Sequence, residues 1–175
     1  MTPFFIVGSP RSGTTILRNY LKKKTRLICP EETFYYRWTF PFGSTEYLNR
    51  VNSNLQKKHR QIDQINESDF QSLLENSQSR RELLLGHIKL MGGKDDLNWF
   101  EKTPQHVYSI PLILSDFPDA SILFVVRNPL DSIASIYSGK TLIPGSLKAA
   151  IAYWNEAYTL YRFYEKILKN IFIIR

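Results

Sequence analysis

The sequence predicts an α/β fold in which helices flank a central parallel sheet of about four or five strands, giving three layers. Two observations indicate this. Short apolar runs of the length of buried strands alternate along the chain with longer segments of helical period. These helical segments can serve as crossovers, which join parallel strands and cover both faces of a sheet. A chain of 175 residues is large enough to bury a core as a single domain.

The first apolar run, residues 4–7, is followed by a loop of small residues and then a helix. Gly8 and Gly13 are spaced like the glycines of the phosphate-binding loop G-x-x-x-x-G-K-[ST]. Such a strand, loop and helix direct backbone N–H groups and the positive end of a helix toward an anion. The loop therefore predicts a P-loop-like fold. Thr14 replaces the usual lysine, which disfavours a metal-bound triphosphate, and Arg11 supplies the cation.

The helix after this loop has apolar residues at near-helical spacing. We expect Ile16, Leu17, Tyr20 and Leu21 to form its inward face. Residues 30–80 contain no comparable buried strand and are predicted to be a helical and loop insertion. Its aromatic stretch, residues 34–42, either lines a ligand pocket or forms a satellite core.

Two further strands are expected at residues 83–87 and 99–102, with a turn at 92–96 between them. Thr103 and Pro104 then read as the N-cap and first residue of a helix. We expect Pro111 to kink that helix.

The last third of the chain repeats the alternation. Residues 121–126 read as a strand, and Asn128 and Pro129 cap the helix that follows. A long helix of about residues 146–169 precedes a final apolar run, residues 171–174, expected to be the last central strand. Ligands of such sheets bind at the carboxyl ends of the strands, where the first loop, Lys102 and Arg127 would emerge.

Two motifs resemble those of sulfotransferases that use 3′-phosphoadenosine 5′-phosphosulfate (PAPS). The segment Gly8-Ser-Pro-Arg-Ser-Gly-Thr-Thr15 resembles their 5′-phosphosulfate loop. Residues 122–135 resemble their 3′-phosphate motif, in which a strand ends in arginine and a serine follows eight residues later. The resemblance implies that the donor is bound by Pro10, Arg11, Ser12, Gly13, Thr14, Thr15, Arg127 and Ser135.

The resemblance also implies catalytic residues. Glu31-Glu32-Thr33 is similar to a triplet of tyrosylprotein sulfotransferases whose second glutamate is the general base, which makes Glu32 the candidate. Lys102 resembles the lysine placed near the leaving phosphate, and Arg11 would contact the phosphosulfate. His87 and His106 remain alternative bases, because some sulfotransferases use histidine.

The implied activity is transfer of a sulfuryl group from PAPS to a hydroxyl by in-line displacement, with PAP as the product and no metal. The acceptor would be a small molecule, a glycan or a peptide, and residues 30–80 would lie on its side of the site. Residues 1–175 would be one sulfotransferase domain, truncated at its C-terminus, because the family continues beyond this last strand. The rival interpretations are a P-loop nucleotide kinase or NTPase and a non-catalytic nucleotide-binding relic.

The charge and hydrophobicity of the sequence limit the kinds of partner that we expect the protein to bind. The net charge is +7, but the basic clusters are scattered, which argues against nucleic acid. A donor with several negative charges, with or without an anionic acceptor, would account for the bias instead. The sequence has no run long enough to span a membrane, and it enters a strand without room for a signal peptide. We therefore expect a cytoplasmic, bacterial protein. Its oligomeric state is not readable from the sequence.

Overall fold

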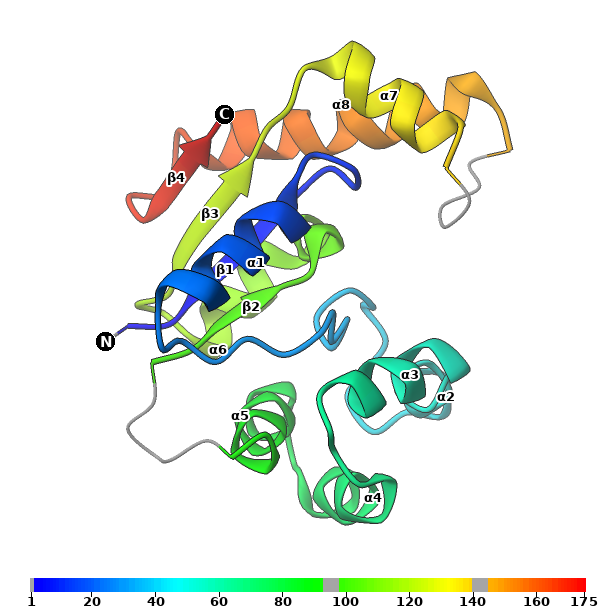
Figure 1. The fold of residues 1–175 in the computed structure, drawn as a ribbon, viewed down its shortest axis with the longest axis vertical. Helices are drawn as coiled ribbons and strands as arrows, with labels where there is room; N and C mark the ends of the chain where they lie inside the picture. The colour runs from blue at the N-terminus through cyan, green and yellow to red at the C-terminus, as the bar shows by residue number, and fades with distance from the viewer. Residues whose placement is uncertain (1, 93–97, 140–144) are drawn as a thin grey trace.

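The computed structural model describes residues 2–92, 98–139 and 145–175. Its sheet is parallel throughout, with the strand order β2-β1-β3-β4 (Figure 1). The predicted α/β class is confirmed, with four strands in the described residues. The strands are β1 (Phe4–Gly8), β2 (Phe100–Lys102), β3 (Ser121–Val125) and β4 (Ile171–Ile174).

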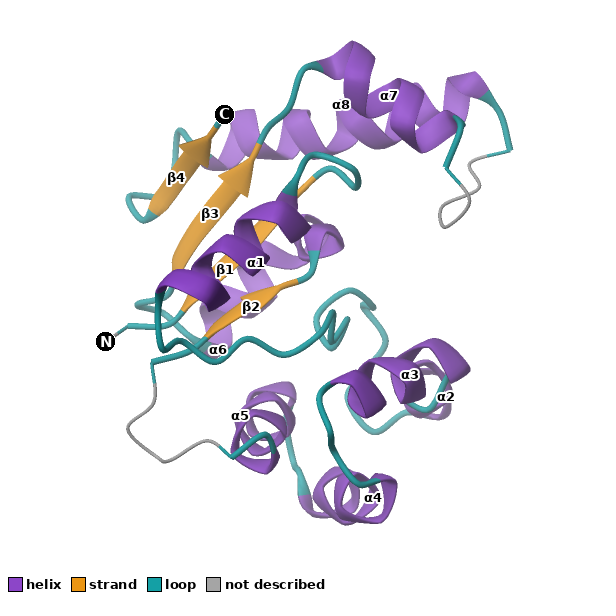
Figure 2. Cartoon of the chain, in the orientation of Figure 1, coloured by secondary structure: helices purple, strands orange, loops and turns teal. Residues whose placement is uncertain are grey.

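The alternation of side chains along β1 separates two apolar layers. Phe5 and Val7 belong to the main core, whereas Ile6 belongs to a smaller cluster on the other face, against which Phe4 packs. Leu17 of α1 packs on that smaller cluster. Helices thus cover both faces, giving the three predicted layers (Figure 2). The sheet is flanked by α1 (Thr14–Lys24), the 3₁₀ helix η1 (Pro104–Ser109), α6 (Ile110–Asp116), α7 (Pro129–Tyr137) and α8 (Leu147–Tyr164).

A group of four helices lies beside the β2 edge of the sheet (Figure 2). Each begins at a side chain that accepts a backbone N–H, which is the usual N-cap. Tyr35, Tyr36 and Tyr47 are fully buried in the main core, so part of the aromatic stretch is structural. The helices are α2 (Thr45–Val51), α3 (Asn54–Ile62), α4 (Glu67–Asn76) and α5 (Arg80–Leu90).

The predicted strand at residues 83–87 is wrong, because these residues lie within α5. Ser79 accepts a hydrogen bond from the backbone N–H of Glu82, and Glu82 accepts one from the N–H of Gln78. This arrangement starts a helix in the manner of a capping box. A short apolar run cannot distinguish a buried helix from a strand, and the helix cap decided it here.

Other local expectations also need correction. Thr103 does not cap the next helix, because its hydroxyl bonds Glu101 instead, and a 3₁₀ segment precedes α6. Ile16 and Tyr20 are exposed, so only part of the predicted inward face of α1 packs on the sheet. The final strand β4 pairs only with β3 and lies at the edge of the sheet. The predicted turn at 92–96 falls largely outside the described residues.

The order of strands places one switch point beside β1. The chain runs from β1 to β2 on one side, and then crosses to β3 and β4 on the other. A crevice forms at the carboxyl ends of the strands where the winding reverses. The loop after β1 and the segment after β3 meet there. Among the described residues, no helix is long and apolar enough to cross a membrane.

Replacing Gly8 by alanine should lower the free energy of unfolding by roughly 2 kcal/mol or more. Gly8 has φ +153°, and an added Cβ would lie 2.5 Å from the carbonyl oxygen of Val125. Gly43→Ala is the matched control: its φ is +80°, but its Cβ would meet nothing within 4 Å. Urea unfolding of both variants measures the difference. Equal losses would contradict the proposed backbone clash between β1 and β3.

Candidate active site

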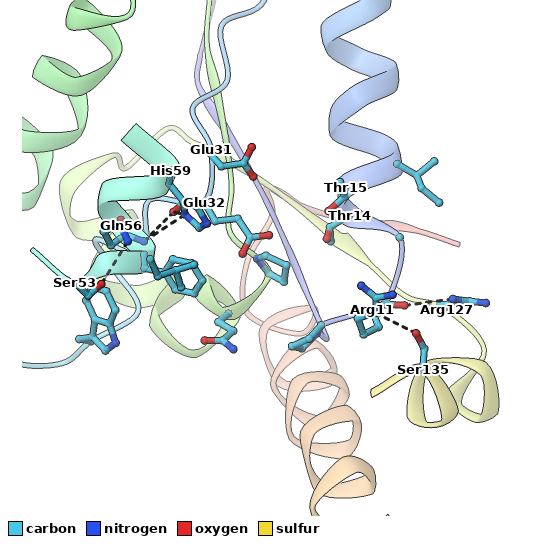
Figure 3. A pocket seen from close by; sticks show the side chains of 18 residues that line it. Arg11, Thr14, Thr15, Glu31, Glu32, Ser53, Gln56, His59, Arg127 and Ser135 are labelled. Atoms are coloured by element: carbon cyan, nitrogen blue, oxygen red, sulfur yellow. Dashed lines mark hydrogen bonds between the residues drawn. The ribbon is translucent and has the colours of Figure 1, made fainter. Parts of the chain in front are cut away.

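A cavity of about 650 Å³ opens at the switch point, and Figure 3 shows the side chains around it. One side is formed by the loop after β1 with Arg127 and Ser135. The opposite side is formed by the segment that contains Glu31 and Glu32 and by the start of α3. Residues from several distant parts of the chain therefore face one space. The predicted site residues that line it are Pro10, Arg11, Gly13, Thr14, Thr15, Glu32, Arg127 and Ser135.

The loop after β1 has the backbone of an anion-binding turn. Arg11 and Gly13 both have left-handed φ values, +67° and +102°, on either side of Ser12. Alternating backbone of this kind turns successive N–H groups toward one side, and the first N–H groups of α1 have no acceptor within the helix. The Ser12 hydroxyl is buried and has no hydrogen-bond partner among the described residues. These features fit a phosphate or sulfonate group.

The two halves of the predicted donor site are in direct contact. The Arg11 Nε donates to the Ser135 hydroxyl at 3.1 Å, and the Arg127 guanidinium donates to the carbonyl oxygen of Arg11 at 3.5 Å (Figure 3). Arg127 follows β3 directly, and Ser135 lies on α7, which Asn128 caps through the N–H of Leu130. Two positive charges thus lie at one rim of the sheet. They suit a ligand with two separate anionic groups.

Lys102 and Glu32 form an ion pair behind this rim. Lys102 ends β2, its side chain is 1% exposed, and its Nζ bonds one carboxylate oxygen of Glu32. The same Nζ lies 3.4 Å from the Thr15 hydroxyl. Lys102 therefore connects Glu32 to the first turn of α1, directly after the loop that follows β1. Figure 3 shows Glu32 extending toward the side of the cavity where Thr14 and Thr15 lie.

Glu31 lines the same cavity, but its carboxylate is paired with a different cation. It forms an ion pair with Arg18 of α1. Burial alone would raise the pKa of Glu31, but the hydrogen bond and charge of Arg18 outweigh it and hold the pKa below the usual range. Of the two adjacent carboxylates, only Glu32 is paired with the strand-end lysine.

The backbone around Glu32 is anchored on three sides. The N–H of Glu31 donates to the carboxylate of Asp63 at 2.9 Å. The carbonyl oxygen of Glu32 accepts from the Gln56 amide at 3.1 Å and from His59 Nδ1 at 2.7 Å. The N–H of Thr33 donates to the buried Glu101. These bonds hold the glutamate at the cavity wall.

His87 and His106, the alternative bases, are buried and lie outside the cavity lining. His106 Nε2 accepts the N–H of Tyr36, so its proton is on Nδ1, which donates to Glu101 at 2.9 Å. His87 bonds the Tyr35 hydroxyl and Asp63 through its two nitrogens. Both rings therefore have structural hydrogen bonds at both nitrogens.

Sequence reasoning missed three residues of the site. His59, Gln56 and Asp63 all hold the segment around Glu32, and the first two also line the cavity. His59 lies among lysines and an arginine in the sequence, a setting typical of a solvated side chain. Only the proximity of α3 to residues 31–33 gives these side chains a role, and no local sequence signal marks that contact.

A second cavity, of about 560 Å³, adjoins the first on the other side of the loop. The two share Gly13, Ile16 and Arg127, so they lie next to each other at the start of α1. Trp154 and Tyr158 of α8 give the second cavity an apolar wall, and Ser12 lines it too. The exposed position of Ile16 is explained by its place between the two cavities.

Comparison with known proteins agrees with this geometry. The model of the sulfotransferase family matches residues 3–174. Human protein-tyrosine sulfotransferase 1 is 28% identical over 161 residues, which cover 90% of this chain and 40% of that protein. The chain thus spans less than half the length of this curated relative.

Solved structures share the fold. The sulfotransferase domain from the curacin biosynthetic pathway superposes with a TM-score of 0.71 at 20% identity, covering all of this chain and 67% of that domain. The sulfotransferase domain of the Synechococcus PCC 7002 olefin synthase gives a TM-score of 0.76 at 17% identity, covering 99% and 66%. Because the family model covers nearly the whole chain, this protein belongs to the sulfotransferase family.

Proposed function

We propose that this site transfers a sulfuryl group from PAPS to a hydroxyl group by in-line displacement, with Glu32 as the general base. The observation that carries the proposal is the cavity in which Glu32 faces the loop of Arg11 and the clamp of Arg127 and Ser135. A proton acceptor and an anion-binding site thus border the same space. The acceptor is a hydroxyl of a small molecule, a glycan or a peptide.

The donor half of the proposal rests on charge and backbone. Arg11, the turn around Ser12 and the start of α1 suit the 5′-phosphosulfate. Arg127 and Ser135 suit the 3′-phosphate, and the apolar second cavity suits the nucleoside. No acidic residue lies in the first turn of α1 to repel an anion there.

The catalytic half rests on the pair of Lys102 and Glu32. As the acceptor oxygen bonds sulfur, its proton passes to the Glu32 carboxylate, and the sulfur–oxygen bond to the phosphate breaks with its electron pair on PAP. Lys102 and Arg11 stabilise the negative charge on the sulfonate and the departing phosphate. Thr14 stands where kinases have their phosphate-binding lysine, so Lys102 and Arg11 supply the positive charge that neutralises the sulfonate and the phosphate.

Thermal denaturation with nucleotides tests the donor assignment. Adenosine 3′,5′-bisphosphate should raise the melting temperature, because ligands that bind only the folded state stabilise it. ATP with magnesium should raise it much less. Stabilisation by ATP with magnesium and none by the bisphosphate would instead favour a kinase or NTPase.

Arg127→Ala should weaken binding of the bisphosphate by about 1–3 kcal/mol, the scale of a hydrogen bond to a charged group. The loss should be smaller for adenosine 5′-phosphate, which lacks the 3′-phosphate assigned to Arg127. Arg162→Ala on α8 is the control, because this arginine is also exposed and lies outside both cavity linings. Titration calorimetry gives the affinities. An equal loss for both nucleotides would contradict the assignment of Arg127 to the 3′-phosphate.

A further inference from the structure

We infer that the acceptor half of the cavity takes an uncharged aromatic alcohol, that is, a hydroxyl carried on a planar ring. The inference rests on the proposed function and names the acceptor class for the same site. It is carried by a stack of three rings beside Glu32, by the pairing of the charges there, and by the hydrogen bonding of His59.

Three rings from two segments stack at the acceptor end of the cavity, and we call them the ring stack: His59, Phe34 and Trp38. The Phe34 ring lies 5.9 Å from Trp38 with an interplanar angle of 20°, and 6.1 Å from His59 with an angle of 23°. All three line the cavity, and Leu55 lies beside them. A planar ring packs well against such a surface, because offset stacking adds to the burial of apolar area.

Phe34 adopts an unusual backbone conformation to take this place. Its φ is +56°, in the left-handed region that bulky side chains rarely occupy. Strain of this kind persists where the surrounding structure holds it, and it is concentrated at functional sites. The hydrogen bonds of Glu31, Glu32 and Thr33 hold the preceding backbone. Phe34 is thereby placed two residues after the proposed base.

The charges at this end are already paired. Glu31 is paired with Arg18 and Glu32 with Lys102, and both cations are largely buried. Among the described residues, the two arginines that line the cavity, Arg11 and Arg127, lie at the donor end. In the part of the chain that the structure describes, no uncommitted charged side chain lines the cavity beside the ring stack, so an uncharged acceptor fits better.

The polar side chains at this end each already make a hydrogen bond within the protein. The Gln56 amide donates to the carbonyl oxygen of Glu32, and the Gln105 carbonyl oxygen accepts from Arg37. The Ser53 hydroxyl accepts from the N–H of Gln56. A sugar ring has several hydroxyls that each need a partner. Part of the hydrogen-bonding capacity of this lining is thus already used, which favours an acceptor with one hydroxyl over a sugar ring.

His59 supplies the acceptor for that one hydroxyl. Its Nδ1 donates to the Glu32 carbonyl oxygen at 2.7 Å, and a carbonyl oxygen only accepts. The proton of the neutral ring is therefore on Nδ1, and Nε2 is a hydrogen-bond acceptor without a partner among the described residues. A hydroxyl that donates to Nε2 would be held beside Glu32. His59 is thus an orienting residue for the acceptor.

The test measures binding of alcohols to protein saturated with adenosine 3′,5′-bisphosphate, using titration calorimetry and no turnover. The probes are 2-naphthol, cyclohexanol, methyl glucoside, N-acetyltyrosinamide and a peptide with tyrosine between glutamates. We expect 2-naphthol to bind about tenfold more tightly than cyclohexanol or the glucoside, on the scale of stacking plus buried area. The peptide with flanking glutamates should bind no more tightly than N-acetyltyrosinamide.

Variants of the cavity wall test which side chains contact the aromatic alcohol. Trp38→Leu should weaken binding of 2-naphthol about fivefold or more, whereas Phe163→Ala, which removes an exposed ring outside the cavity lining, should not. His59→Asn can keep a donor near the Glu32 carbonyl but lacks Nε2. His59→Asn should weaken the binding of 2-naphthol more than the binding of naphthalene, which has no hydroxyl. Melting temperatures of the variants check that each is folded.

The outcomes separate the two proposals. Failure of the bisphosphate to bind at all overturns the proposed function and this inference with it. If the bisphosphate binds but cyclohexanol, the glucoside or the acidic peptide binds most tightly, only the acceptor class is overturned. Unchanged binding of 2-naphthol in Trp38→Leu would remove the ring stack from the acceptor site.

Discussion

Glu32→Gln should lower sulfuryl transfer by about 10²–10⁴-fold while binding of adenosine 3′,5′-bisphosphate is retained. The glutamine keeps the size of the side chain and can still contact Lys102, but it cannot take a proton from the acceptor hydroxyl. The measurement is transfer of labelled sulfate from PAPS, read as the rate at saturating donor. Calorimetry with the bisphosphate shows in parallel that the donor site is intact.

The neighbouring carboxylate provides the matched control for this experiment. Glu31 lines the same cavity and is adjacent in sequence, but it is paired with Arg18 rather than Lys102. Glu31→Gln should therefore retain most of the transfer rate. A Glu32→Gln variant that keeps full activity would exclude Glu32 as the base. Equal losses in both variants would indicate that the segment, rather than one carboxylate, had been disturbed.

Glu101→Ala should lower the free energy of unfolding by about 3–5 kcal/mol, because each buried donor left without a partner costs about 1–3 kcal/mol. The carboxylate of Glu101 is fully buried and accepts hydrogen bonds from Thr33, Thr103 and His106. Its removal leaves these buried donors without a partner. Urea unfolding measures the loss, and the exposed Glu75→Ala should change stability by no more than about 0.5 kcal/mol.

The same carboxylate predicts the direction of the acid response. Burial alone would raise the pKa of Glu101, but its electrostatic interaction with His106, together with the hydrogen bonds from His106, Thr103 and Thr33, brings the pKa below the usual value. Its stabilisation is therefore complete above the pKa of the unfolded chain, about 4.3, and is lost as the pH falls through the lower folded pKa. In Glu101→Gln, stability should fall less steeply below about pH 4. An unchanged slope would contradict this assignment.

The fold was largely predictable because its signals are local. The apolar run before Gly8, the cap at Asn128 and the last run before the C-terminus each indicate their element within a few residues. The wrong prediction of secondary structure also has a local cause. The helix α5 was taken for a strand, because its short apolar run hid the helix start at Ser79.

The residues of the candidate site also fall into two groups: those that sequence motifs predicted, and those that only the folded chain brings to the cavity. Arg11 and Arg127 could be named from motifs, since loops at the ends of parallel strands carry their function in a few adjacent residues. His59 and Phe34 could not be assigned to the cavity wall, because nothing near them in the sequence records that α3 packs against residues 31–33. Their stacking and the bond from His59 to the Glu32 carbonyl exist only in the folded chain.

The sequence alone determined the α/β class, the position of the glycine-containing loop after the first strand and the resemblance to sulfotransferases, because strand period, glycine spacing and helix caps act between near neighbours. The tertiary structure decided that Lys102 pairs with Glu32, that Arg127 contacts the backbone of Arg11, and that an aromatic stack lines the same cavity as Glu32. These contacts join residues far apart in the chain. They depend on how the strands are ordered and how the helices pack, which no local pattern specifies.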